Sequence, residues 1–137
     1  MNLGYQEEEL WDLDNTEAFN GNISAMKWSI NQGFGDVKAM AYTYTYDPLN
    51  RLEDAIHWES ENLSTWSTGQ FDEKITGYDL NGNIINLQRK GEDGVTIDNL
   101  TYHYETETEE ASNKLLYVTD AAAAPAKAKG FLDGNAG

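Results

Sequence analysis

The amino-acid sequence predicts an all-β fold in which antiparallel β-hairpin repeats join into one extended, twisted sheet. Apolar and aromatic residues alternate with polar residues over several segments, which is the period-two signature of half-buried strands. Clusters of Asn, Gly and Asp separate these segments, and such residues favour tight turns. The clusters recur at a nearly constant interval, which indicates a repeat protein. No window of similar length has a convincing helical period.

The alternation is clearest in residues 38–46. Positions 40, 42, 44 and 46 are Met, Tyr, Tyr and Tyr, and the positions between them are Ala or Thr. Residues 23–31 and 96–105 repeat the pattern. Aromatic side chains in strands usually pack across neighbouring strands, so we expect them in the core. The residues expected there are Trp28, Tyr42, Tyr44 and Tyr102. The predicted strands cover residues 3–11, 23–31, 38–46, 52–60, 71–78, 84–90, 96–105 and 114–119, with connections near 31–37, 60–70 and 91–95.

Four of the turn clusters end in an asparagine that precedes an aliphatic strand start. These clusters lie at residues 20–22, 47–50, 79–83 and 111–113, and their closing asparagines are Asn22, Asn50, Asn83 and Asn113. The spacings between these asparagines are 28, 33 and 30 residues. We therefore interpret each unit as one strand–turn–strand hairpin. Because a lone hairpin is marginal in water, the units are expected to pair side by side.

The chain is expected to divide at its alanine-rich segment. Residues 1–120 form the array of about four hairpins. Residues 121–137 form a loop, with a short helical turn before Pro125, followed by the start of a further repeat that the chain does not finish.

The formal charge of −15 excludes several classes of partner. Nucleic acid and anionic lipid both need exposed Lys and Arg, so no nucleic-acid partner is expected. No segment is long and apolar enough to insert into a membrane. There is no Cys, which excludes thiolate chemistry, and the N-terminus is not a signal peptide, so any export signal lies outside this chain.

Two segments, residues 44–52 and 78–84, resemble the Tyr-Asp (YD) repeat of the RHS (rearrangement hot spot) family, in its Bacteroidetes-type arrangement. The resemblance extends over roughly residues 19–134. The first turn departs from the pattern with Phe19-Asn20, and the fourth with Tyr104-Glu105 and an acidic insertion. The repeat-motif residues that the resemblance implies are Asn22, Tyr46, Asp47, Asn50, Arg51, Tyr78, Asp79, Gly82, Asn83 and Asn113.

The resemblance implies a non-catalytic function. Proteins of this family form a ribbon of hairpins that spirals into a hollow shell, which encloses or presents a C-terminal toxin or effector domain. The chain would then be a segment of the shell wall of a secreted or cell-surface bacterial protein. Its partners would be neighbouring repeats and the enclosed domain, and no cofactor or metal is expected.

The residues that carry other chemistry have simpler explanations. His57 and His103 are the only histidines, and both fall on the polar face of a predicted strand, where we expect a solvated or sheet-face side chain. The many carboxylates are expected to form an acidic surface and not a glycosidase pair. Residues 79–83 and 12–15 are similar to fragments of calcium loops, but neither has both the sixth-position Gly and the twelfth-position Glu.

An alternative function is a cell-surface carbohydrate- or protein-binding β-repeat module. Four Trp and eight Tyr are enough for an exposed aromatic platform. Trp58 and Trp66 are the aromatic residues expected to face such a ligand, and Trp66 is expected to be the more exposed because Ser and Thr flank it.

Overall fold

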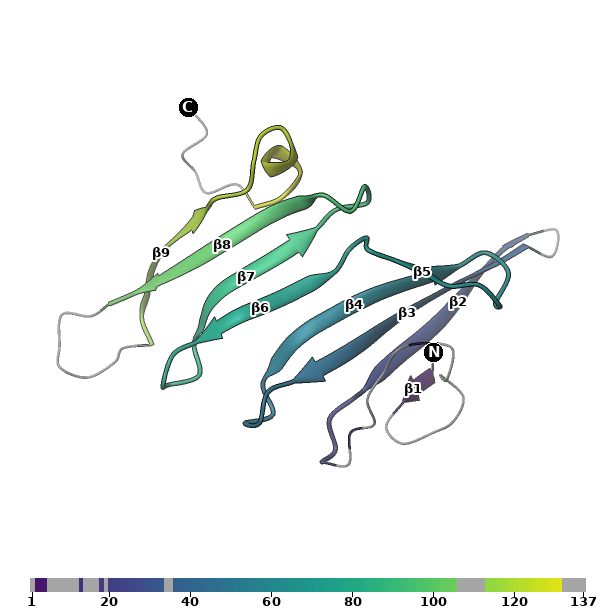
Figure 1. Cartoon of the computed structure of the whole chain (residues 1–137), viewed down its shortest axis with the longest axis horizontal. Coiled ribbons are helices and arrows are strands. Elements are labelled where there is room, and N and C mark those ends of the chain that lie inside the picture. The colour runs from purple at the N-terminus through teal and green to yellow at the C-terminus, as the bar shows by residue number, and fades with distance from the viewer. Residues whose placement is uncertain are drawn as a thin grey trace. The chain divides into compact units, whose positions relative to one another are not determined.

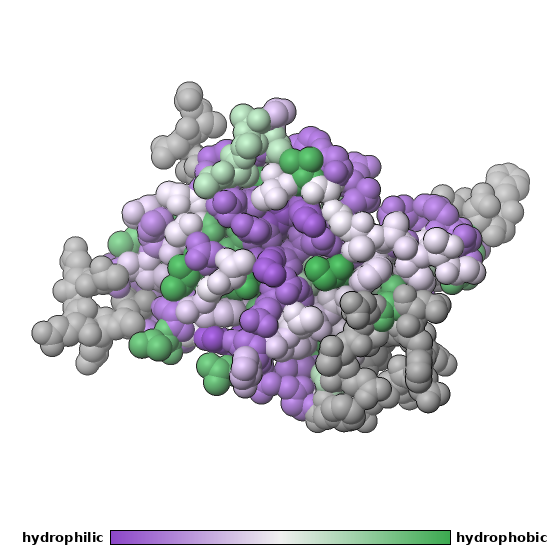
Figure 2. Space-filling view, viewed as in Figure 1, coloured by the Kyte–Doolittle hydropathy of each residue, from purple (hydrophilic) through white to green (hydrophobic). Residues whose placement is uncertain are grey.

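The structure is a computed structural model, which describes residues 2–4, 13, 18, 20–33, 36–105 and 113–131. The described residues form antiparallel strands and one short 3-10 helix, without an α-helix, so the predicted all-β class is confirmed. The chain divides into two compact units, residues 1–72 and 73–137. The surface seen in Figure 2 is mostly hydrophilic, with hydrophobic residues scattered singly, in keeping with the strong net charge.

The first unit is a meander in which each strand pairs with the next one in the sequence (Figure 1). A short strand, β5, pairs with β4 at Trp58 and Glu59. Side chains opposite one another in an antiparallel pair share a face, so the register Trp28↔Met40 and Tyr42↔His57 defines an aromatic face of this unit. Its strands are β1 (Asn2–Gly4), β2 (Ala25–Gly33), β3 (Asp36–Tyr46), β4 (Leu52–Ser60) and β5 (Ser67–Thr68).

The second unit has the same connectivity, and its strands again follow one another in the sheet (Figure 1). The ladders between them are antiparallel throughout. Its strands are β6 (Glu73–Tyr78), β7 (Ile84–Lys90), β8 (Thr96–Tyr104) and β9 (Leu115–Asp120).

Two of the expected connections contain strand, and part of the prediction lies outside the described residues. The expected connection 31–37 is mostly strand, because β2 extends to Gly33 and β3 begins at Asp36. The expected connection 60–70 contains β5, a polar two-residue strand too short to produce a periodic pattern. Of the predicted strand 3–11, residues 5–11 lie outside the described residues, and the turn at 111–113 is described only at Asn113.

The core of the first unit lies on the face opposite the one expected. Ala25 and Ala41 are completely buried, Leu13 is 4% exposed, and the indoles of Trp58 and Trp66 pack against them. Small side chains on the strands leave room for large rings to lie over the sheet, so alanine is buried deepest. The aromatic residues expected in the core, Trp28, Tyr42, Tyr44 and Tyr102, are all only half-buried.

The C-terminal segment of the second unit folds back along β8. The 3-10 helix, η2 (Ala126–Lys129), follows Pro125 and does not precede it as expected, and it contacts β8. The Nζ of Lys129 contacts Asp93 Oδ2 at 3.0 Å, and the N–H of Ala121 donates to Asn99 O at 3.0 Å. The segment therefore covers the part of β8 that extends beyond its pairing with β9.

Candidate functional site: the repeated turns

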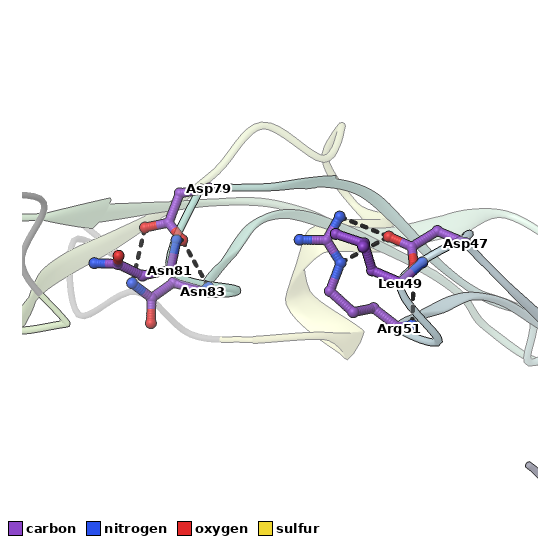
Figure 3. A network of polar contacts seen from close by, with 6 residues as sticks. All are labelled: Asp47, Leu49, Arg51, Asp79, Asn81 and Asn83. Carbon is purple, nitrogen blue, oxygen red and sulfur yellow. Dashed lines mark hydrogen bonds and ion pairs between the residues drawn. The ribbon is translucent and has the colours of Figure 1, made fainter.

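The turn between β3 and β4 is built around one carboxylate, Asp47 (Figure 3). Its Oδ1 accepts hydrogen bonds from the N–H groups of Leu49 and Arg51, both at 2.9 Å. Its Oδ2 contacts the Arg51 guanidinium through Nε at 2.7 Å and Nη2 at 2.6 Å. The backbone closes the loop through Asp47 N–H to Arg51 O and Asn50 N–H to Asp47 O, both 2.9 Å. One side chain thus organises all five residues of the turn.

The turn between β6 and β7 has the same geometry around Asp79 (Figure 3). Asp79 Oδ1 accepts from the N–H groups of Asn81 at 2.9 Å and Asn83 at 2.8 Å. Asp79 Oδ2 accepts from Asn83 Nδ2 at 2.8 Å, so an amide takes the place that a guanidinium has in the other turn. The backbone bonds again join Asp79 N–H to Asn83 O and Gly82 N–H to Asp79 O.

The fourth position of each turn has a positive φ, and this corrects the expected equivalence of the closing asparagines. Asn50 has φ 62° and Gly82 has φ 84°, so these two residues correspond. Asn83 therefore corresponds to Arg51 and not to Asn50. Gly21, with φ 88°, precedes Asn22 in the same way that Gly82 precedes Asn83. Because Asn and Gly both tolerate this region, a sequence pattern of Asn residues does not show which one occupies it.

A further turn with the same backbone, between β7 and β8, was not expected to match. Gly91 N–H donates to Val95 O at 2.9 Å, Gly94 N–H donates to Gly91 O at 3.0 Å, and Gly94 has φ 73°. A Cβ added to Gly91 would lie 2.9 Å from Ile97 Cγ2, which explains the absence of Asp at the first position. The backbone geometry of the turn therefore does not require the Tyr-Asp motif.

Both turn carboxylates are stabilised in the charged form. Partial desolvation raises the pKa of Asp47, but hydrogen bonds from Arg51 and Leu49 outweigh it and the net pKa is lowered. The hydrogen bond from the Asn83 side chain is the largest cause of the lowered pKa of Asp79. The lone pairs of Asp79 are thus used inside the turn, which favours a structural role over a calcium loop.

In each unit one tyrosine hydroxyl binds a backbone carbonyl of the neighbouring segment: Ile23, just before β2, in the first unit and Ile84, at the start of β7, in the second. The Tyr46 hydroxyl donates to Ile23 O at 2.8 Å, and the Tyr104 hydroxyl donates to Ile84 O at 3.0 Å. Burial raises the pKa of both phenols. Tyr104 was not among the expected motif residues, because Glu105 follows it where the motif has Asp. Tyr78, the tyrosine of the other Tyr-Asp pair, lies opposite Ile84 in the β6–β7 ladder.

The turns of one unit are also joined by asparagine pairs. Asn20 Nδ2 donates to Asn50 Oδ1, and Asn83 Nδ2 donates to Asn113 Oδ1 at 2.9 Å. Both pairs span 30 residues, which is the interval that the sequence repeat predicts. Asn22 lies half-buried beside them, and its Nδ2 has no partner among the described residues.

The two histidines occupy different environments, and His57 lies on a sheet face, which is the aromatic face and not the expected polar one. His57 is only 5% exposed and lies edge-on to Tyr42 and Phe71, with ring centroids 5.2 and 5.4 Å away. Burial lowers its pKa. His103 is half-buried, stacks on Tyr117 at 4.3 Å and contacts Thr119 Oγ1. The strand alternation places His57 opposite Tyr42, on the aromatic face.

Trp58 and Trp66 do not form the expected ligand platform. Both pack against the core of the first unit, and Trp58 Nε1 donates to Thr43 Oγ1 at 3.0 Å. Trp66, expected to be exposed, is half-buried, and Lys27 Nζ lies 4.9 Å from the centre of its ring. Polar neighbours in the sequence gave no sign of this packing, because the residues beneath Trp66 come from β2 and β3.

A buried ion pair in the second unit was missed by the sequence interpretation. Asp98 is completely buried, and Arg89 contacts its Oδ2 through Nε at 2.6 Å and Nη2 at 2.5 Å. Phe131 N–H donates to Asp98 Oδ1, and a Cβ added to Gly130 would lie 2.5 Å from Ile97 O. The pair thus fixes the C-terminal segment on β8.

Within the described ranges, no three His, Cys, Asp or Glu side chains lie close enough to hold a metal ion. No described helix has the length and apolar character needed to cross a membrane. Residues 12, 14 and 15 of the other calcium-like fragment lie outside the described residues.

Comparison with known proteins gives no relative for this chain. No family model, no curated protein and no solved structure matches it.

Proposed function

We propose that the chain is a non-catalytic structural segment of an RHS/YD-repeat shell, which encloses or presents a C-terminal toxin or effector domain. The observation that carries the proposal is the shared hydrogen-bond pattern of the Asp47 and Asp79 turns, which join β3 to β4 in the first unit and β6 to β7 in the second. A repeated structural turn is what a shell built from identical hairpins needs.

The hydrogen bonds that the motif side chains make support this role. The Asp47 and Asp79 carboxylates bind turn amides, the Tyr46 hydroxyl binds the segment before β2, and Asn83 binds Asn113. Such groups hold the hairpins in register. The proposal also assigns the chain to a secreted or cell-surface bacterial protein, with adjacent repeats and the enclosed domain as partners.

The test has a sequence arm and a protein arm. The reading frame that encodes the chain is expected to hold many further Tyr-Asp units and then a variable C-terminal domain. In the purified whole product, that domain should resist protease under conditions that digest it when expressed alone. A frame without further units, or a C-terminal domain digested equally fast in both forms, would refute the shell.

A second candidate is a carbohydrate- or protein-binding module that uses the aromatic face. Trp28, Tyr42 and Tyr44 form a stacked row with ring centroids 6.1 Å apart, and Phe71 beside it is 41% exposed. Trp58 and Trp66 pack against the core of the first unit, which favours the row of Trp28, Tyr42 and Tyr44 as the ligand surface. A glycan array and tryptophan quenching test it, and saturable binding that Trp28→Ala abolishes and Phe71→Ala weakens would favour the module over the shell.

A further inference from the structure

The outer edge of β9 is the most exposed apolar feature of the second unit. Leu115, Leu116 and Tyr117 are consecutive, and 46%, 52% and 55% of their respective surfaces are exposed. β8 pairs with one edge of β9, and no described strand pairs with the other. An unpaired edge presents free N–H and C=O groups to any compatible strand.

The equivalent strand of the first unit shows what such an edge accepts. β4 follows the Asp47 turn as β9 follows the last turn of its own unit. β5 pairs antiparallel with part of its outer edge, through Trp58↔Thr68 and Glu59↔Ser67. An antiparallel strand is therefore the kind of occupant that suits this position of the hairpin.

The β8–β9 ladder determines which backbone groups of β9 face outward. Ala121 N–H donates to Asn99 O, and hydrogen-bonded pairs alternate along an antiparallel ladder. By this alternation, the backbone N–H and C=O of Tyr117 point to His103 on β8. Those of Val118 point to the outer edge of β9. Leu116 has no partner on β8, because the register shifts by one residue there. The groups of Leu116 and Val118 are thus available to another strand.

We propose that this edge binds β9 of a second copy of the chain, antiparallel and centred on Tyr117. In this register Leu116 lies opposite Val118 of the partner subunit, and both contribute outward backbone groups. Lys114 lies opposite Asp120 of the partner subunit, and these two residues bound the uncharged segment 115–119. Lys114, whose side chain is 65% exposed, keeps its contact with Glu105 at 2.8 Å.

Charge explains why β9 is the surface that tolerates a second copy. Each chain carries a net charge of −15, so two chains repel over most of their surface. Residues 115–119 carry no charge and bring apolar side chains from both faces of the strand. The pair is isologous, because the same edge serves both subunits, and it closes as a dimer without forming a filament. The pairing does not rest on the shell function.

The register is tested with single cysteines, since the chain has none of its own. In the proposed pair the two copies of residue 117 face each other at a non-hydrogen-bonded position, with Cα atoms about 4.5 Å apart. That distance lies within the range that a disulfide spans. Tyr117→Cys is therefore expected to form a disulfide-linked dimer under mild oxidation. Leu80→Cys, at a fully exposed turn leucine, is the matched control and should cross-link far more slowly.

Light scattering over a concentration series reaching about 1 mM tests the association itself. Leu116→Lys should raise the dissociation constant about tenfold or more, because it places a charge in the apolar pair. Leu80→Lys makes the same change in net charge outside β9 and should leave the constant unaltered. A chain that stays monomeric throughout, or equal cross-linking rates of the two cysteine variants, would overturn the proposal. The shell function would survive either result, because it is tested on the whole reading frame.

Discussion

At the scale of single residues, the repeat depends on polar groups whose partners are backbone atoms. The Asp47 carboxylate binds two turn amides, and the Tyr46 hydroxyl binds the carbonyl of Ile23, which precedes the adjacent strand β2. Such bonds fix the position of a chain segment without requiring a particular side chain on the other strand. This explains how hairpins with little sequence identity can share one geometry.

The tyrosine links give the first prediction. Tyr46→Phe and Tyr104→Phe each remove one hydroxyl that donates to a backbone carbonyl, while the ring stays in place. Each variant should lose about 1 kcal/mol in the free energy of unfolding, measured by urea titration. Tyr117→Phe, at a ring 55% exposed, is the control and should change stability little. Equal losses in all three variants would show that the hydroxyl bonds have no special role.

His57 gives a prediction about pH. Its pKa is lowered in the folded state by burial, so the unfolded chain binds the proton more readily. The contribution of His57 to the free energy of unfolding is fully present at pH values above its ordinary pKa of 6.5. It is lost as the pH falls from 6.5 toward the lower pKa of the folded state. Glu59 and Asp72 favour the charged ring, and Lys38 opposes it. Tyr42 packs against the ring as well.

Unfolding measured between pH 7.5 and 5 tests this dependence. His57→Leu should weaken the dependence of the free energy of unfolding on pH. His103→Leu, at a half-buried histidine, should leave that dependence unchanged. Asp47 and Asp79 do not interfere, because their pKa values are lowered from 3.8 and they stay charged over this range. If the free energy of unfolding of the wild-type chain did not change between these pH values, the role assigned to His57 would be contradicted.

At the scale of elements, the five-residue turn is a unit that can be exchanged. Residues 47–51 and 79–83 share their hydrogen bonds and the positive φ of the fourth position. Replacing 47–51 by the sequence of 79–83 should therefore change the melting temperature by less than about 5 °C. Asn50→Val is the contrasting variant and should cost about 1–2 kcal/mol, because a β-branched residue is strained at φ 62°. An exchanged chain that fails to fold would refute the equivalence of the turns.

The sequence predicted most strands and turns of this fold because both depend on local chemistry. Alternation along 38–46 and the Asp-x-x-Asn-Arg turn after it need no knowledge of distant residues. The core could not be predicted in this way. Ala25, Ala41 and Trp66 come together only when three separate segments meet, and an alternating strand offers two faces of which either can be buried.

The candidate site shows the same limit. Asp47 and Asp79 were identified because each turn amide that they bind lies within four residues. The Asp98–Arg89 pair was missed, because its third member, Phe131, is 33 residues away and nothing in the sequence marks Asp98 as buried. Acidic residues are numerous in this chain, so composition does not distinguish a buried carboxylate from a solvated one.

At the scale of the whole molecule, the net charge of −15 opposes folding through self-repulsion. Salt screens exposed charges over a Debye length of about 30 Å at 0.01 M and about 8 Å at 0.15 M. Raising sodium chloride between these concentrations should therefore raise the melting temperature, measured by circular dichroism. Potassium chloride at equal ionic strength is the control for a specific ion effect. A melting temperature that falls with salt would mean that ion pairs such as Lys129–Asp93 outweigh the repulsion.

The meander order of the strands has a consequence for how the protein is made. Within each unit every strand pairs with the strand that precedes it in the chain, so no strand waits for a distant partner. Hairpins form in microseconds, whereas a ribosome adds only about 5–20 residues each second. Each strand can therefore dock as soon as it leaves the exit tunnel, and the growing sheet never has more than one open edge that awaits its partner. Synthesis itself then sets the order of assembly, and wrong pairings between distant strands have little time to form.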